Sequence, residues 1–267
     1  MRPLRTVLGI DAAWTTKQPC GVAVVLETVD GWQLKAAQSS YHNFHVLADR
    51  QLTPELRPSG SLPNVPTLLK TASAIAERSI DLVAVDMPLA YSQIICRRVA
   101  DNEVSRKYGA RYCSTHSPNA LRPGLVSNTV RESFAEAGYP LQTISITTPG
   151  LIEVYPHPAL LELTNAPHRL PYKVDKSRRY WPDRGKAERE RLIFQQWREI
   201  IKHLDREISG VQVMLPEPAS GSRALLKAYE DMVDAIVCAW VGICVLEGRA
   251  HTFGNADSAI WVPCPRN

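Results

Sequence analysis

A single apolar helix near the C-terminus constrains this chain more than any other segment. Helical periodicity extends over residues 223–247, and residues 232–246 are apolar at nearly every position. Such a segment packs against other elements on all sides instead of lying on a surface. The rest of the chain must therefore supply layers that cover this helix.

Two carboxylates stand near the start of the apolar part of this helix. Asp231 and Asp234 are about one helical turn apart and share a face. Carboxylates beside apolar surface cost free energy unless a positive charge lies between them, and a divalent cation would supply that charge. We therefore examine the ends of the strands for acids that could meet this pair.

The composition is that of an ordinary globular protein. The 267 residues are 45% hydrophobic and 22% charged, which suffices for one large domain or two small ones. No run reaches the ~18–20 apolar residues that span a bilayer, and residues 1–5 lead into an apolar run too short for a signal peptide. The net charge of +4 permits nucleic-acid binding but does not argue for it.

The six cysteines are scattered along the chain and include no CxxC pair. This spacing disfavours a zinc site, and free thiols are typical of a reducing compartment. We expect a cytoplasmic protein with no membrane segment.

The first forty residues predict three strands. Residues 6–11, 21–26 and 32–38 are short, mostly apolar runs, and Asp30-Gly31 is a hairpin signal before the third. We expect them to form an antiparallel meander, with Asp11 at the tip of its first strand.

A second strand that ends in an acid follows a predicted helix. Residues 67–79 have helical spacing, and residues 80–86 repeat the apolar run closed by an acid. A helix and then a strand after a meander favour a parallel crossover onto the first strand. That crossover would bring Asp11 and Asp86 to the same edge of the sheet.

The remaining segments are assigned from periodicity and composition. Residues 42–66 contain four prolines and are expected to form an irregular loop, whereas residues 169–191 carry nine Lys or Arg against four acids. No internal repeat or linker stands out, so we expect one domain over residues 1–267, with insertions at about 90–148 and 165–210. Further helices are expected at 92–108, 129–137 and 186–206, and further strands at 151–156, 211–215 and 259–262.

Four short segments, taken in their order and spacing, resemble one known family. They are Gly9-Ile10-Asp11, Val85-Asp86-Met87-Pro88, Glu153-Val154-Tyr155-Pro156 and Glu230-Asp231-Met232-Val233-Asp234-Ala235. The set resembles the RNase H-like superfamily, with helix acids similar to those of RuvC-type Holliday-junction resolvases. It is most similar to the predicted RNase H-like nucleases of the domain of unknown function 429 (DUF429) family. This resemblance implies an α/β fold whose RNase H-like mixed sheet, an antiparallel three-strand meander plus parallel strands, is flanked by helices.

The resemblance also implies a metal site and its neighbours. One position departs from the family, because Tyr155 stands where the family segment has histidine, and His157 lies two residues on. For substrate binding the resemblance points to the basic residues Arg97, Arg111, Lys173 and Arg191. It assigns catalysis and metal binding to Asp11, Asp86, Asp231 and Asp234, with Glu153 as a further metal ligand.

The chemistry that would use these residues is metal-assisted phosphodiester hydrolysis. Several carboxylates without soft ligands suit Mg²⁺ or Mn²⁺. We expect a metal-dependent nuclease that hydrolyses nucleic acid by a two-metal RNase H-like mechanism. The basic segment 169–191 would hold phosphates, and Tyr172, Tyr180 or Trp181 would stack on bases. DNA and RNA both stay open as substrates, and so does the oligomeric state.

Two other functions stay open. An actin-like ATPase or phosphotransferase relative would share the strand order, but it needs a glycine-rich phosphate loop, and residues 12–19 contain no glycine. A non-catalytic binding protein that has kept the RNase H fold is the other. The acids also have structural interpretations, with Asp11 and Asp86 in turns and Asp231 as a favourable charge near a helix N-terminus.

Overall fold

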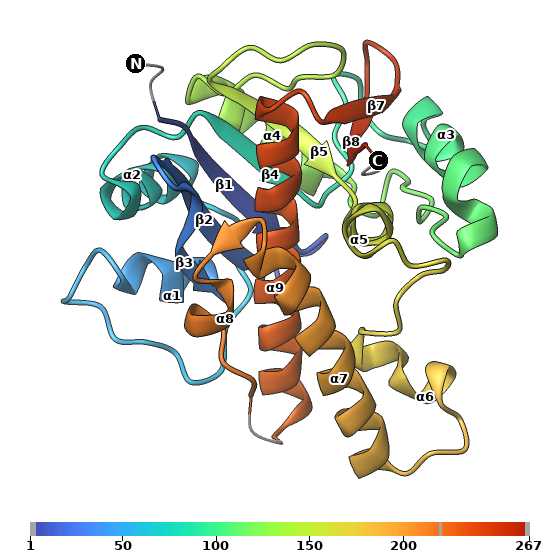
Figure 1. The fold of residues 1–267 in the computed structure, drawn as a ribbon. Helices are drawn as coiled ribbons and strands as arrows, with labels where there is room; N and C mark the ends of the chain where they lie inside the picture. The colour runs from blue at the N-terminus through green and yellow to red at the C-terminus, as the bar shows by residue number, and fades with distance from the viewer. Residues whose placement is uncertain (1–3, 219–220, 265–267) are drawn as a thin grey trace.

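The computed structural model describes residues 4–218 and 221–264 as an α/β fold in which one curled, mixed sheet is flanked by helices (Figure 1). Within those residues the sheet has eight strands, in the order β6-β3-β2-β1-β4-β5-β8-β7. Residues 1–3 lie outside the described residues. They belong to the N-terminal segment that we do not expect to be a signal peptide. The strands are β1 (Thr6–Asp11), β2 (Gly21–Thr28), β3 (Gly31–Gln38), β4 (Leu82–Val85), β5 (Gly150–Val154), β6 (Ile208–Ser209), β7 (Ala250–Gly254) and β8 (Ala259–Pro263).

The predicted meander and crossover are confirmed. β1 pairs antiparallel with β2, and β2 pairs antiparallel with β3. β4 lies parallel to β1, and β5 lies parallel to β4. Because the carboxyl ends of parallel strands meet at one edge of a sheet, this pairing brings Asp11, Asp86 and Glu153 to that edge.

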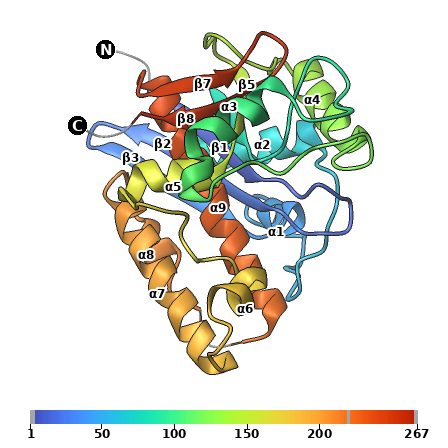
Figure 2. The same ribbon diagram turned by 90° about the vertical axis from the view of Figure 1, so that its right-hand side faces the viewer.

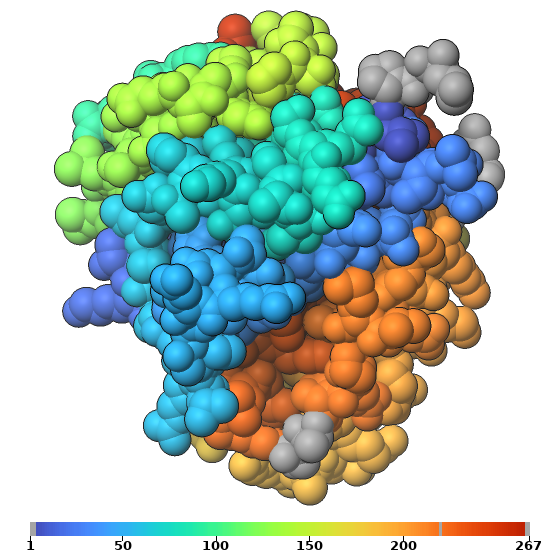
Figure 3. All heavy atoms as spheres, turned by 90° about the vertical axis from the view of Figure 1, so that its left-hand side faces the viewer, coloured from blue at the N-terminus to red at the C-terminus, as the bar shows by residue number. Residues whose placement is uncertain are grey.

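Helices cover both faces of the sheet (Figures 1 and 2). On one face, apolar side chains of α5, α7 and α9 share a core with Val7, Ala23 and Leu82 of the sheet. α1, α2 and α4 pack against the other face, and Figure 3 views the molecule from that side. The helices are α1 (Tyr41–Val46), α2 (Val65–Ala76), α3 (Val99–Tyr108), α4 (Leu125–Glu136), α5 (Pro156–Thr164), α6 (Ser177–Tyr180), α7 (Lys186–Asp205), α8 (Val211–Met214) and α9 (Arg223–Leu246).

The apolar helix that most constrains the sequence is α9, and it ends one residue before the expected position. All but a few of its residues from Leu226 onward are buried, as expected for a helix in the core. Among the described helices, none is both long and apolar enough to cross a lipid bilayer.

Two segments differ in type from the expectation. The sequence favours a strand at 211–215, but α8 occupies it, because Gly210 adopts φ +88° and turns the chain into a short helix. Residues 42–66 are expected to be irregular, yet α1 extends into them, capped by Ser40, whose hydroxyl accepts a hydrogen bond from the Asn43 backbone N–H. Short apolar runs do not distinguish helix from strand, and a cap is easily overlooked before so short a helix.

Other boundaries also shift. The helix expected at 92–108 begins only at Val99, and α5 and β7 have no predicted counterpart. α5 starts at Pro156, where a proline is favourable because its fixed φ suits the first helical turn. A Pro-His-Pro sequence therefore starts a helix here, although it resembles a loop.

Two glycines set the distance between α9 and the sheet. A Cβ atom on Gly9 of β1 would lie 2.2 Å from the Ala235 carbonyl oxygen of α9, and one on Gly21 of β2 would lie 1.8 Å from the Asp231 carbonyl oxygen. Neither gap has room for a side chain. α9 therefore lies directly on the two strands, with Asp231 level with the carboxyl end of β1.

We predict that Gly9→Ala destabilises the protein by about 2–3 kcal/mol, because the new methyl group must push against helix backbone in a packed core. Gly185→Ala is the matched control, since a Cβ atom there meets nothing within 4 Å and φ is ordinary. Urea denaturation of the two variants measures the difference. A Gly9→Ala protein as stable as Gly185→Ala would contradict this account of how α9 is seated.

Candidate functional site

A cavity of about 640 Å³ opens at the carboxyl edge of β1, β4 and β5. Its wall mixes acids with bases, an arrangement that suits a ligand carrying both a cation and phosphates. The acids are Asp11, Asp86, Asp101, Glu153, Asp175, Glu230 and Asp231, and the cationic side chains are Arg98, Arg122, Arg169, Lys173, Lys176 and Lys227.

Asp11 and Asp86 reach this cavity from the strand ends. Successive side chains of a strand alternate between faces, and Val7 and Leu82 pack into the core on the α9 side. By the same alternation Asp11 and Asp86 face α9. Within the described part of the chain, neither carboxylate accepts a hydrogen bond or forms an ion pair. Burial and then the negative charge of Asp11 raise the pKa of Asp86 well above its usual value.

The acids of α9 are held by two lysines. Lys227 contacts the Asp231 carboxylate, and its Nζ lies 3.0 Å from Glu230 Oε1. Lys173 contacts the Asp234 carboxylate, and its Nζ lies 3.3 Å from the same Glu230 oxygen. All three carboxylates belong to residues that are no more than 3% exposed. These lysines supply the positive charge that buried acids require.

Asp234 lies deeper than the other acids and does not line the cavity. It is 0% exposed, and its Oδ1 accepts a hydrogen bond of 2.7 Å from the Tyr172 hydroxyl. Burial disfavours the charged form of Lys173, but the carboxylates of Asp234 and Glu230 favour it, and the pKa of Lys173 is raised well above its usual value. Asp234 and Lys173 therefore form an internal ion pair beneath the cavity floor.

A metal ion has a restricted choice of ligands here. Across residues 4–218 and 221–264, no group of three or more His, Cys, Asp or Glu side chains is arranged to hold a metal ion. The carboxylates of Asp11 and Asp86, which have no partner among these residues, are hard oxygen donors. Mg²⁺ commonly uses one or two carboxylates, several waters and substrate phosphates. Asp11 and Asp86 are therefore donors of the chemical kind that such an ion uses.

Glu153 is engaged by a buried arginine. Ile152 and Val154 pack toward α9, so Glu153 between them points to the other side of the sheet from Asp11 and Asp86. The Arg98 guanidinium donates to both of its carboxylate oxygens, at 2.6 and 2.7 Å. Burial nevertheless raises the pKa of Glu153 to about 7. Glu153 thus fastens Arg98 and leaves no carboxylate oxygen without a hydrogen bond for a metal.

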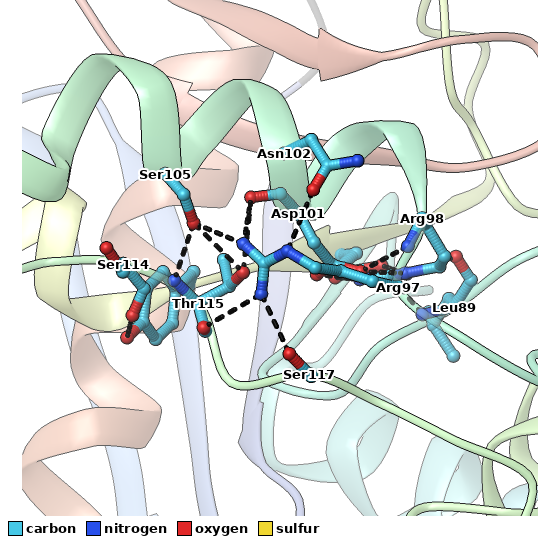
Figure 4. Close-up of polar contacts among 11 residues, drawn as sticks. Leu89, Arg97, Arg98, Asp101, Asn102, Ser105, Ser114, Thr115 and Ser117 are labelled. Atoms are coloured by element: carbon cyan, nitrogen blue, oxygen red, sulfur yellow. Dashed lines mark hydrogen bonds and ion pairs between the residues drawn. The ribbon is translucent and has the colours of Figure 1, made fainter.

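Arg97, next to Arg98, forms a separate network (Figure 4). Its guanidinium donates to side chains of α3 and to the following loop, and it does not line the cavity. The acceptors are Asn102 Oδ1, Asp101 O, Ser105 Oγ, Thr115 O and Ser117 Oγ. Arg97 therefore anchors the loop that brings Thr115, His116 and Ser117 to the cavity wall.

The other basic residues named from the sequence have different positions. Lys173 lines the cavity, whereas Arg111 and Arg191 do not. Arg111 pairs with Glu162 at 3.1 Å, and Arg191 pairs with Glu188 at 2.8 Å on the exposed side of α7.

Two further cationic side chains line the cavity: Arg169 belongs to the basic segment 169–191 that the sequence predicts to hold phosphates, whereas Arg122 lies outside it. Arg169 donates to Nε2 of the buried His157, and burial lowers the pKa of that histidine, so the ring is neutral. Within the described residues Nδ1 of His157 has no hydrogen-bond partner. At the rim the Arg122 guanidinium lies 5.9 Å from the ring centre of Trp14. Arg122 comes from a loop of its own, and no local motif in the sequence indicates it.

Lys227 does have a signal in the sequence. It precedes Asp231 by four residues on the same helix, the spacing at which opposite charges pair. Glu230 stands in the quoted acid motif as well, so the helix itself predicts part of this network.

Comparison with known proteins identifies one family. The family model described as "Protein of unknown function (DUF429)" matches residues 9–258 of this chain. No curated protein and no solved structure gives a significant match.

We predict a pH dependence of stability from Asp86. Its raised pKa means that the folded state binds a proton more tightly than the unfolded chain, so the free energy of unfolding decreases as pH rises above the usual aspartate value of 3.8. Asp86→Asn should make that decrease shallower. Urea denaturation across a pH series, in chelator, measures it.

The control is Asp30→Asn, which changes an exposed aspartate at the hairpin between β2 and β3 and should keep the wild-type profile. Identical pH profiles for Asp86→Asn and the wild type would show that burial and the charge of Asp11 do not raise the pKa of Asp86.

Proposed function

Because the chain belongs to the DUF429 family of proteins of unknown function, we propose its activity from the site: it is a divalent-metal-dependent nuclease, built on an RNase H-like fold, that hydrolyses phosphodiester bonds of nucleic acid. The order of the elements supports the fold assignment. An antiparallel meander of β1 to β3 is followed by parallel β4 and β5, and the late helix α9 carries acids to the same edge.

One observation carries the proposal. Asp11 and Asp86 stand at the ends of adjacent parallel strands, face the same cavity and have no partner among the described side chains, while cationic side chains stand elsewhere in the cavity wall. Unpaired acids next to each other are a cost to the fold that a bound cation relieves. Cationic side chains in the same cavity suit the phosphates of a substrate.

Asp11 and Asp86 would hold the Mg²⁺ or Mn²⁺ ion. When bound, such an ion polarises a phosphoryl oxygen and lowers the pKa of a coordinated water. Asp231 lies near the pair: burial and then the negative charge of Asp11 raise its pKa well above the usual value, and the Lys227 ammonium group opposes that shift. The chain's own contribution is to fix the two carboxylates at the ends of adjacent paired strands.

Arg122, Arg169 and Lys176 would bind the phosphate backbone. Arg169 is oriented by the neutral His157, which accepts one of its N–H groups and leaves the others for a ligand. Trp14 offers a half-buried aromatic ring at the cavity wall on which a base can stack. We place this activity in the cytoplasm, because all six cysteines are free in the described chain.

A non-catalytic binding protein is the second candidate, and one observation favours it. Lysine ammonium groups already contact Asp231 and Asp234, so these two acids do not require a metal ion as counter-charge. A protein that binds nucleic acid but neither binds Mn²⁺ nor cleaves would support this alternative. The actin-like ATPase has no such support, because the turn after β1 offers no glycine-rich phosphate loop.

We predict that the purified protein cleaves nucleic acid with Mg²⁺ or Mn²⁺, and that Asp11→Asn and Asp86→Asn each lower the rate by about 100-fold or more, equivalent to about 2.7 kcal/mol of transition-state stabilisation. A panel of single-stranded DNA, single-stranded RNA, duplexes and branched junctions tests it. Asp30→Asn is the control for loss of an aspartate. No cleavage of any substrate with either metal would refute the nuclease assignment.

We also predict which bases contact the phosphate backbone. In an Asp86→Asn background that does not cleave, Arg122→Ala and Lys176→Ala should each make the log–log dependence of single-strand affinity on salt shallower by about 0.7. Arg178→Ala and Arg179→Ala are matched controls, since both residues are exposed on α6 and do not line the cavity. Equal slopes in all four variants would move the backbone contacts away from the cavity.

A further inference from the structure

Two lysine ammonium groups pair with the three carboxylates of α9. Lys173 and Lys227 approach the same Glu230 oxygen, at 3.3 and 3.0 Å, and each also contacts one aspartate. Lys173 contacts Asp234, and Lys227 contacts Asp231. Two ammonium groups thus bridge three carboxylates, which is the charge pattern that a metal ion would otherwise provide.

We propose that Lys173 and Lys227 take the place of a second metal ion, so that the site binds one divalent ion, at Asp11 and Asp86. This inference rests on the proposed function and replaces the two-metal mechanism expected from the sequence. The division follows the direct contacts of the acids: in the described part of the chain those at the strand ends form no hydrogen bond or ion pair, whereas each acid on α9 contacts a lysine ammonium group.

A metal ion cannot readily replace the Lys173 ammonium group, because that group is held by two buried carboxylates. Its side chain is 18% exposed, while those of Glu230 and Asp234 are 2% and 0% exposed. Glu230 Oε2 also accepts a hydrogen bond of 2.6 Å from the Val174 backbone N–H, and Tyr172 donates to Asp234. Removing the ammonium group would leave carboxylates buried without a counter-charge, which is strongly unfavourable.

Both lysines line the cavity, so their charge is available to a substrate as well. A fixed ammonium group beside a phosphodiester offsets the negative charge that develops during cleavage, as a second metal ion does in two-metal sites. Lys227 has the more exposed side chain, at 36%, and is therefore the one whose removal the fold tolerates better.

The test is the number of Mn²⁺ ions bound by the full chain without nucleic acid, measured by isothermal titration calorimetry and by electron paramagnetic resonance of free Mn²⁺. Wild type should bind one ion. Lys227→Met should bind a second, because Asp231 and Glu230 lose a counter-charge, whereas Lys227→Arg should still bind one. Lys70→Met, which changes an exposed lysine of α2, is the matched control and should also bind one.

The outcomes separate the inference from the proposed function. Two ions bound by the wild type would overturn the proposal that lysines replace the second metal ion, but would leave the metal-dependent nuclease assignment intact. One ion in both wild type and Lys227→Met would overturn the role of Lys227. No ion in wild type would remove the proposed function together with this inference. If Lys227→Met fails to fold by circular dichroism, Lys227→Gln, which keeps a polar side chain of similar length, serves instead with the same expected second ion.

Discussion

The direct contact between α9 and the first two strands is the constraint on which the rest of the structure depends. Gly9 and Gly21 leave no side chain between helix and sheet, so the helix backbone rests on the strand backbone. At this spacing the position of α9 along its axis is set by packing, and Asp231 stands level with the end of β1. A bulkier residue at either glycine would lift the helix and separate its acids from Asp11. The core therefore positions the site.

That packing has an electrostatic consequence. Bringing α9 down onto the sheet gathers carboxylates from three elements at one edge, where each is partly or wholly out of water. The chain compensates the innermost ones with lysines, because a buried carboxylate without a counter-charge costs several kcal/mol. Within the described residues, Asp11 and Asp86 form no hydrogen bond or ion pair, and both line the cavity. The cavity wall thus presents carboxylates without a direct partner beside carboxylates that lysines already contact.

Much of the scaffold of this site follows from the sequence, and the reasons are local. Apolar runs closed by an acid predict β1 and β4, and the crossover rule brings Asp11 and Asp86 together. Alternation along β5 could also have excluded Glu153 from that pair, because its apolar neighbours face α9. Which of the adjacent residues Arg97 and Arg98 is buried is harder to predict: Asp101 is a local partner of Arg98, three residues on, but Glu153 reaches Arg98 only through the tertiary fold.

The parts that escape sequence reasoning belong to the loops rather than to the sheet. Strands have a fixed period, so their side chains can be assigned to a face from the sequence alone, whereas loop side chains such as Arg122 and Arg169 follow no period. The same difference separates two kinds of function. Acids on strands are held rigidly enough for chemistry at a defined point, and bases on loops can vary in number and position without disturbing the core. In this chain the Arg97 side chain bonds both to the loop at Thr115 and to Ser105 of α3. This part of the cavity wall is therefore anchored to a helix. The acids at the strand ends therefore keep fixed positions at the edge of the cavity, and the anchored loop supplies a part of its wall that can differ without moving them.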